Sequence, residues 1–219
     1  MMVKVKICGI TNLEDAMAAV DAGCDALGFI FSKSSPRYIT PKKAGEIIKR
    51  LARPVIKIGV FVNAKEKHIK RVARSLGLNM LQFHGGESAQ FCRKFKNYKI
   101  IKTFKLPVGT GFKPVPTKNS LDLQSMLQYR PFAYLFDTYS PSKAGGTGKQ
   151  FNWKLLRHID ALERPVFLSG GLRAGNVLRA IKSVRPDWVD ASSSLESSPG
   201  KKDHRKVRKF IEAAKRAEY

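Results

Sequence analysis

Five side chains that can move protons or bind anions follow short apolar stretches of this sequence. They are the thiol of Cys8, the guanidinium of Arg37, the imidazole of His84 and the carboxyl groups of Asp137 and Asp190. A thiol, an imidazole and a carboxyl group can each donate or accept a proton, and a guanidinium attracts anions. If the fold brings them together, they suit a small anionic substrate that needs both an acid and a base.

Each of these residues also has an ordinary structural interpretation. A cysteine such as Cys8 is often a small buried hydrophobic residue, and His84 can be a hydrogen-bonded packing residue. Asp137 can cap the loop that follows it, and Asp190 can orient a neighbour or accept hydrogen bonds from backbone amides. Arg37 can be one more surface charge in a basic chain. The functional hypothesis therefore depends on the fold that would position all five.

Eight short apolar or β-branched runs alternate with amphipathic helical stretches along the chain. Thr40 before Pro41 and Asn63 are typical helix N-caps, and Gly77 is typical of a helix end. The predicted strands are Val3 to Ile7, Ala26 to Phe31, Val55 to Val62, Met80 to Phe83, Tyr98 to Phe104, Ala133 to Phe136, Pro165 to Leu168 and Asp187 to Val189.

This alternation predicts a parallel sheet, because strands that run in one direction need crossover connections. Eight units in 219 residues favour closure into a (β/α)8 TIM barrel, with residues 1–219 as a single domain. The segment from Leu106 to Ser120, rich in proline and glycine, is the weakest part of the pattern, and an open doubly wound sheet is the alternative. In such a barrel the chemistry lies at the C-terminal ends of the strands, where the five side chains stand.

Glycines and serines after the last two predicted strands indicate a phosphate-binding site. "LSGGL" contains Gly170 and Gly171, and Ser192 and Ser193 belong to a serine cluster that follows the eighth strand. Backbone N–H groups in these two loops form the usual phosphate site of phosphate-binding barrels. A tight structural turn is the alternative interpretation.

A second glycine-rich segment, "AGGTGKQ" at residues 144–150, does not fit a phosphate loop. The P-loop pattern requires glycine where Lys143 stands and serine or threonine where Gln150 stands. The segment also lacks the third glycine of a dinucleotide-binding fingerprint. We interpret it as a mobile loop after the sixth strand.

The charge of the chain is strongly positive, with 41 Lys and Arg against 17 Asp and Glu, a net charge of +24 and a pI near 10.2. Such a balance raises the prospect of a nucleic-acid partner. The cations are spread along the whole chain, however, and occur opposite apolar positions in the predicted helices. This distribution favours solvated helix faces over a dedicated nucleic-acid surface.

The cysteines predict a reducing compartment. Cys8, Cys24 and Cys92 are widely spaced, with no CxxC pair and no histidines at zinc-binding spacing, so neither a disulfide framework nor a metal site is expected. No apolar run approaches the roughly 20 residues of a membrane span, and the N-terminus lacks the pattern of a secretory signal. We expect a cytoplasmic protein without a membrane partner.

The assembled motifs closely resemble the phosphoribosylanthranilate isomerase family of tryptophan biosynthesis over essentially the whole chain. The similarity is specific because many motifs occur in the family's order. They are "KICGIT", "GFIF", "SPRYI", "IGVFVN", "LQFHG", "LFDT", "GGTGKQFNW", "LSGGL", "VDASS" and "PGKKDH".

The resemblance implies a cofactor-free Amadori rearrangement of a phosphorylated anionic substrate. Asp137 would be the general acid that protonates the ribose ring oxygen, and Cys8 the general base that removes the proton from C2. Arg37 would receive the anthranilate carboxylate, while Asp190 and His84 would touch the ribose hydroxyls or support the catalytic pair. The resemblance assigns phosphate binding to Gly170, Gly171, Ser192 and Ser193.

These roles set requirements on the pKa values of the acid and the base. Asp137 must stay protonated, so burial or a nearby negative charge has to raise its pKa. Cys8 must ionise, and the basic surroundings are expected to lower its pKa.

The chain departs from the family pattern at two positions. Ser194 stands where the family commonly has glycine, and Asn152 where it commonly has aspartate. A side chain at position 194 would be unfavourable if the backbone there needs a positive φ.

Two other functions are weighed against this one. A ribulose-phosphate epimerase-like barrel would need clustered metal-binding histidines, whereas His68, His158 and His204 lie in helical stretches. A basic nucleic-acid-binding barrel that has lost catalysis is the second. A monomer and a homodimer both fit the sequence.

Overall fold

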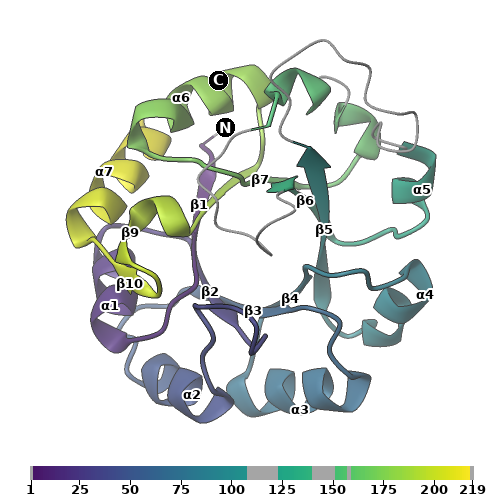
Figure 1. The fold of residues 1–219 in the computed structure, drawn as a ribbon, viewed down its shortest axis with the longest axis horizontal. Coiled ribbons are helices and arrows are strands. Elements are labelled where there is room, and N and C mark those ends of the chain that lie inside the picture. The colour runs from purple at the N-terminus through teal and green to yellow at the C-terminus, as the bar shows by residue number, and fades with distance from the viewer. Residues whose placement is uncertain (1, 108–122, 140–150, 157–158, 218–219) are drawn as a thin grey trace.

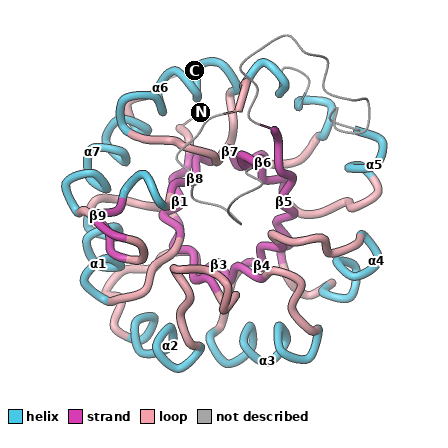
Figure 2. Tube along the Cα trace, in the orientation of Figure 1, coloured by secondary structure: helices cyan, strands magenta, loops and turns pink. Residues whose placement is uncertain are grey.

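A computed structural model describes residues 2–107, 123–139, 151–156 and 159–217 of the chain. Eight parallel strands form a closed barrel in sequence order, with helices around the outside (Figures 1 and 2). β1 pairs with both β2 and β8, which closes the sheet, so the predicted (β/α)8 barrel is confirmed and the open sheet is wrong. The strands are β1 (Lys4–Cys8), β2 (Ala26–Ile30), β3 (Ile56–Phe61), β4 (Met80–Phe83), β5 (Lys99–Pro107), β6 (Ala133–Tyr139), β7 (Val166–Leu168) and β8 (Trp188–Ala191).

The helices that cover the barrel vary in length. The longer ones are α1 (Leu13–Asp21), α2 (Pro41–Lys49), α3 (Glu66–Leu76), α6 (Ala174–Val184) and α7 (His204–Lys215). Between β4 and β7 the described helical segments are shorter, and residues 108–120 of the segment with the weakest pattern lie outside the described residues. It consists of α4 (Ala89–Cys92), α5 (Leu123–Leu127) and the 3₁₀ turns η1 (Arg93–Phe95), η3 (Trp153–Leu156) and η4 (Ile159–Leu162).

Most of the predicted helix ends are confirmed. The hydroxyl of Thr40 accepts the N–H of Lys43, and Gly77 ends α3 with φ 54°. The prediction for Asn63 is wrong, because α3 begins two residues after Ala64. Asn63 instead adopts φ 49°, and its side chain accepts the N–H of Gly86 at 2.8 Å, which joins the loops after β3 and β4.

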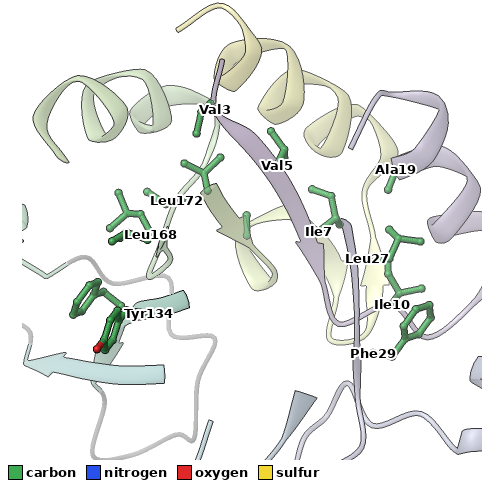
Figure 3. Close-up of a cluster of buried hydrophobic side chains, with 14 of the residues drawn as sticks. Val3, Val5, Ile7, Ile10, Ala19, Leu27, Phe29, Tyr134, Leu168 and Leu172 are labelled. Carbon is green, nitrogen blue, oxygen red and sulfur yellow. The ribbon is translucent and has the colours of Figure 1, made fainter. Parts of the chain in front are cut away.

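Alternate side chains of each strand face two different environments. Val3, Val5 and Ile7 pack under the surrounding helices (Figure 3). Lys4 and Lys6 lie on the other side of the strand. Lys4, at the start of β1, is exposed and lies over the ring of Trp188, whereas Lys6 is fully buried. The closed sheet therefore places Lys6 inside the barrel.

A short hairpin follows the eighth strand and was not predicted. The 3₁₀ turn η5 (Ser193–Leu195) leads into β9 (Glu196–Ser198), which pairs antiparallel with β10 (Lys201–Lys202). Asp15 on α1 accepts the N–H of Lys202 at 2.7 Å, and Thr11 donates to the carbonyl of Gly200. These bonds attach the hairpin to the first βα unit.

Asp25 directly precedes β2 and connects three elements at the N-terminal ends of the strands. Its Oδ2 accepts the N–H of buried Val5 at 2.7 Å and the ammonium of Lys215 on α7 at 2.6 Å. The Asp25 carbonyl also accepts the N–H of Ile56. The Asp25 carboxylate thus joins β1 to α7, and its backbone carbonyl joins the same residue to β3.

Asp25→Ala is expected to lower the free energy of unfolding by about 1–3 kcal/mol, because the buried N–H of Val5 loses its acceptor. Urea denaturation followed by circular dichroism measures this loss. Asp21→Ala, at an exposed position of α1, is the matched control and should change stability little. Equal stability of the Asp25→Ala variant and the wild type would contradict this account.

Candidate active site

A cavity of about 600 Å³ opens at the C-terminal ends of the strands. Its lining draws on the ends of β1, β4, β6, β7 and β8 and on the loops after β2 and β8. All nine residues proposed from the sequence line it: Cys8, Arg37, His84, Asp137, Gly170, Gly171, Asp190, Ser192 and Ser193. The fold therefore brings together groups that lie up to 185 positions apart in the chain.

Cys8 ends β1 at the floor of this cavity, with 6% of its surface exposed. Burial raises the pKa of its thiol above the ordinary value, and the nearby cation of Lys6 opposes this shift only in part. The expected net lowering by basic surroundings is therefore wrong. Removal of the thiol from water outweighs the neighbouring positive charge.

Lys6 and Asp190 form an ion pair directly beneath the cavity. The Lys6 Nζ lies 2.8 Å from Asp190 Oδ2, and both side chains are buried. Burial opposes the charge on Lys6, but Asp190 and Cys8 outweigh it and raise the pKa of the ammonium. The other oxygen, Asp190 Oδ1, has no hydrogen-bond partner among the described residues and belongs to the cavity wall.

Asp137 meets the requirement placed on a general acid. Burial raises the pKa of its carboxyl group to about 6, and the carboxylate of Asp190 adds to that shift. Its Oδ1 accepts the N–H of Thr138 at 2.8 Å, and its Oδ2 lies 3.5 Å from His84 Nε2. The expectation of a raised pKa through burial and a nearby negative charge is confirmed.

His84 is a neutral neighbour of this acid. Burial, together with the positive charges of Lys105, Lys6 and Lys102, lowers the pKa of its ring to about 3. The amide nitrogen of Gln82 lies 3.1 Å from His84 Nδ1. With the amide in this orientation Nδ1 is the acceptor, so the ring proton is on Nε2 and faces Asp137.

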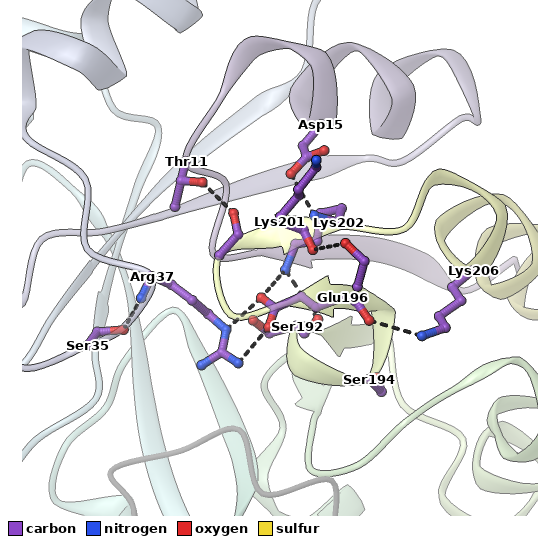
Figure 4. A network of polar contacts seen from close by, with 12 residues as sticks. Thr11, Asp15, Ser35, Arg37, Ser192, Ser194, Glu196, Lys201, Lys202 and Lys206 are labelled. Carbon is purple, nitrogen blue, oxygen red and sulfur yellow. Dashed lines mark hydrogen bonds and ion pairs between the residues drawn. The ribbon is translucent and has the colours of Figure 1, made fainter.

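Arg37 reaches the cavity from the loop after β2, and a carboxylate holds it in place (Figure 4). Its Nε and Nη2 donate to the two oxygens of Glu196, both at 2.7 Å. Lys202 Nζ lies 3.0 Å from the same carboxylate and 3.2 Å from the carbonyl of Ser192. The guanidinium is thus fixed along one edge, and its Nη1 is not used by Glu196.

The predicted phosphate end of the cavity consists of backbone and hydroxyl groups. Gly170 and Gly171 both have positive φ, and a Cβ on Gly170 would collide with Thr138. Only glycine fits this turn between β7 and α6. Ser192 Oγ is buried without a hydrogen-bond partner in the part of the chain that the structure describes, and it lies in the cavity wall.

The two departures from the family pattern have different outcomes. Ser194 lies in η5 and is not among the described non-glycine residues with positive φ, so its side chain causes no backbone strain there. Its hydroxyl donates to the carbonyl of Leu172, which joins the two loops at the phosphate end. Asn152 is exposed and precedes η3, while the glycine-rich residues 144–150 lie outside the described residues.

Sequence reasoning missed Lys6, Glu196 and Lys202. Lys6 was hidden because its alternation with valines is typical of a strand with a solvent-facing side. Lys202 lies within the "PGKKDH" motif, which by itself indicates no partner, and Glu196 lies outside the motifs that carry the resemblance. A lone glutamate in a basic chain, six residues from a lysine, was the available signal for their pairing.

Two further features, a metal site and a membrane-spanning helix, are absent from the described residues. Within the described ranges, no group of three or more histidine, cysteine, aspartate or glutamate side chains is arranged to hold a metal ion. In the same ranges, no helix has the length and apolar character needed to cross a membrane.

The closed barrel, with titratable side chains and a glycine–serine segment gathered in one cavity at its strand ends, is the architecture of an enzyme of the (β/α)8 class. A model of the family described as N-(5′-phosphoribosyl)anthranilate (PRA) isomerase matches residues 5–213. The chain belongs to this family.

Known proteins of the family resemble the chain over nearly its full length. The N-(5′-phosphoribosyl)anthranilate isomerase of Pelobacter propionicus is 46% identical over 214 residues, which are 98% of this chain and 96% of the relative. A crystal structure of monomers generated from the dimeric Thermotoga maritima isomerase has a TM-score of 0.83 at 41% identity. A phosphoribosylanthranilate isomerase in complex with reduced 1-(o-carboxyphenylamino)-1-deoxyribulose 5-phosphate has a TM-score of 0.82 at 41% identity. In both comparisons the match covers 98% of this chain and 99% of the other.

Asp137→Asn is expected to stabilise the protein at pH 8 and not at pH 4. The folded-state pKa of about 6 lies above the unfolded value, so the folded state loses stability as the pH rises through this interval. Asparagine does not ionise, and the variant should gain up to about 3 kcal/mol at pH 8. Urea denaturation at both pH values measures the difference. An equal effect at the two pH values would contradict a buried, protonated Asp137.

Proposed function

We propose that the chain converts N-(5-phosphoribosyl)anthranilate to 1-(2-carboxyphenylamino)-1-deoxyribulose 5-phosphate, the isomerase step of tryptophan biosynthesis. The observation that carries this proposal is the placement of Asp137 and Cys8 in one cavity. The first is a buried carboxyl group whose pKa is raised to about 6, and the second is a thiol beside a buried cation. An Amadori rearrangement needs one such acid and one such base.

Asp137 supplies the first proton. In the closed sugar the ribose ring oxygen leaves C1 as the nitrogen lone pair forms the iminium, and the Asp137 carboxyl group protonates that oxygen. A pKa of about 6 keeps a useful fraction of the acid protonated near neutrality, which a carboxyl group in water would not achieve. The anionic substrate, by excluding water and adding negative charge, raises that fraction further.

Cys8 removes the second proton. The iminium acidifies the C–H bond at C2, and the thiolate takes the proton while the electron pair forms the enolamine. Tautomerisation of the enolamine gives the ketone product. Protons only move between substrate and side chains in this sequence, and the substrate undergoes no net oxidation, so the balance requires no redox cofactor.

The two ends of the cavity match the two anionic ends of the substrate. Arg37 offers the unused edge of its guanidinium to the anthranilate carboxylate, with Glu196 setting its plane. Gly170, Gly171, Ser192 and Ser193 offer backbone N–H groups and hydroxyls to the phosphate. Asp190 and the neutral His84 line the same cavity, and we assign them to the ribose hydroxyls or to the support of the catalytic pair.

The positive charge of the chain does not require a nucleic-acid partner. Arg37, Lys6, Lys102 and Lys202 are buried cations paired with carboxylates inside the protein. We infer that the remaining exposed cations serve solubility and the attraction of an anionic substrate. The three free thiols are consistent with our proposal that the protein works in the reducing cytoplasm. The cavity is lined by residues of one chain, so both a monomer and a homodimer are compatible with it.

Cys8→Ser and Asp137→Asn should each lower kcat by about 10²- to 10⁴-fold, because each removes a positioned acid or base. Loss of substrate fluorescence with freshly prepared phosphoribosylanthranilate measures the rate. Cys24→Ser, on a thiol outside the cavity, is the matched control and should keep the wild-type rate. Normal turnover by both cavity variants would refute the assignment of roles.

Arg37→Ala should raise KM by about 10- to 100-fold, because a charged hydrogen-bonding group for the substrate carboxylate is lost. Glu196→Gln should give a smaller rise, since Arg37 keeps its charge and loses its fixed orientation. Steady-state kinetics separate KM from kcat for both variants. Arg208→Ala, on the exposed face of α7, is the control. An unchanged KM in Arg37→Ala would remove this residue from the carboxylate site.

A further inference from the structure

Lys6 is a buried charge to which the proposed acid–base steps assign no task. It lies two residues before Cys8 on β1, and the pleat of the strand directs both side chains to the barrel interior. Its side chain has no exposed surface, and its Nζ is 2.8 Å from Asp190 Oδ2. A buried ammonium is unfavourable without anionic partners, so its place beneath the base calls for a physical reason.

Gly28 brings the lysine and the thiol together. A Cβ on this residue would lie 2.7 Å from Cys8 Sγ and 3.2 Å from Lys6 Cε. The thiol and the end of the lysine side chain therefore pack on the same glycine of β2, which pairs with Cys8 in the sheet. The missing side chain at this position creates the space in which the two groups are neighbours.

The other charged groups around Cys8 come from several elements. Asp190 on β8 disfavours a thiolate, whereas Lys202 on β10 favours it more weakly than Lys6 does. Arg37 lies over the adjacent Gly9 with its charge directed to Glu196, and β2 contributes the uncharged Gly28. On the far side of the cavity stand the neutral His84 and Asp137. Lys6 is thus the principal cation available to the thiol.

We propose that one ammonium, Lys6, serves two anions: it holds the carboxylate of Asp190 and stabilises the thiolate of Cys8. Asp190 holds the lysine in position and, as an anion, competes with the thiolate for its charge. The inference deepens the proposed function, because it rests on Cys8 being the base. In the reaction the C2 proton passes to Cys8 Sγ, and Lys6 stays protonated throughout.

This arrangement predicts opposite effects from the two partners of the ion pair. Lys6→Met removes the cation that favours the thiolate, so Cys8 should ionise at higher pH. Asp190→Asn removes the competing carboxylate and leaves the full charge of Lys6 to the thiol, so Cys8 should ionise at lower pH. A purely structural role of the pair would damage packing in both variants without moving the ionisation of Cys8 in opposite directions.

The experiment titrates Cys8 in the full chain without substrate. A Cys24→Ser/Cys92→Ala background leaves Cys8 as the only thiol, and neither replaced residue lines the cavity. The rate of alkylation by iodoacetamide is measured against pH, with the ultraviolet absorbance of the thiolate as a second readout. At pH 7.5 we expect alkylation at least about tenfold slower in Lys6→Met and faster in Asp190→Asn.

Two further variants control the comparison. Lys4→Met removes a cation from the same side of the same strand, over Trp188, and should leave the ionisation of Cys8 unchanged. Lys6→Arg keeps the charge and should retain a pH midpoint close to that of the background. If Lys6→Met does not fold, as judged by circular dichroism, Asp190→Asn alone tests the proposal. In that variant the pH midpoint of the alkylation rate should fall.

An unchanged midpoint in Asp190→Asn, or shifts of the same sign in both variants, would overturn the proposal. Because no substrate is present, this result is distinguishable from failure of the proposed function, which would appear as a lack of isomerase activity in the wild type. Support would also come from the kinetics: in Lys6→Met the loss of kcat should diminish as the pH is raised, whereas in Cys8→Ser it should persist.

Discussion

The structure depends on the two-residue period of strands in a closed barrel, where neither face of the sheet meets solvent. Val3, Val5 and Ile7 of β1 pack under the helices, which obliges Lys6 and Cys8 to point inward. The same rule brings Asp137 and Asp190 into the interior. The polar residues at the strand ends thereby converge at one end of the barrel, and the site exists because this alternation is kept around the ring.

Burial then sets the proton affinities at the site. Burial raises the pKa of Asp137 to about 6 and lowers that of His84 to about 3, so one cause gives a partly protonated carboxyl group and a neutral imidazole near neutrality. The same cause acts against Cys8, whose thiolate needs a compensating charge. An acid can be made by desolvation alone, whereas a buried anionic base requires a cation beside it.

The hairpin after β8 holds a second charged group, the guanidinium of Arg37, in place at the cavity. Glu196 and Lys202 form a buried cluster with Arg37, and the hydrogen bond from Lys202 to Asp15 connects that cluster to α1 (Figure 4). A guanidinium on a loop would otherwise sample many orientations. The carboxylate of Glu196 limits it to one, which leaves a defined edge for a second carboxylate.

The sequence by itself determined the order and approximate limits of all eight strands, because hydrophobic periodicity and turn residues are local properties. It also determined the nine cavity residues, since their motifs stand at the strand ends and resemble one family. Only the tertiary structure decided the partners: Lys6 with Asp190, Arg37 with Glu196, and Asn63 with the loop after β4. It also decided that burial raises the pKa of Cys8, because charge balance and desolvation depend on which groups become neighbours when the barrel closes.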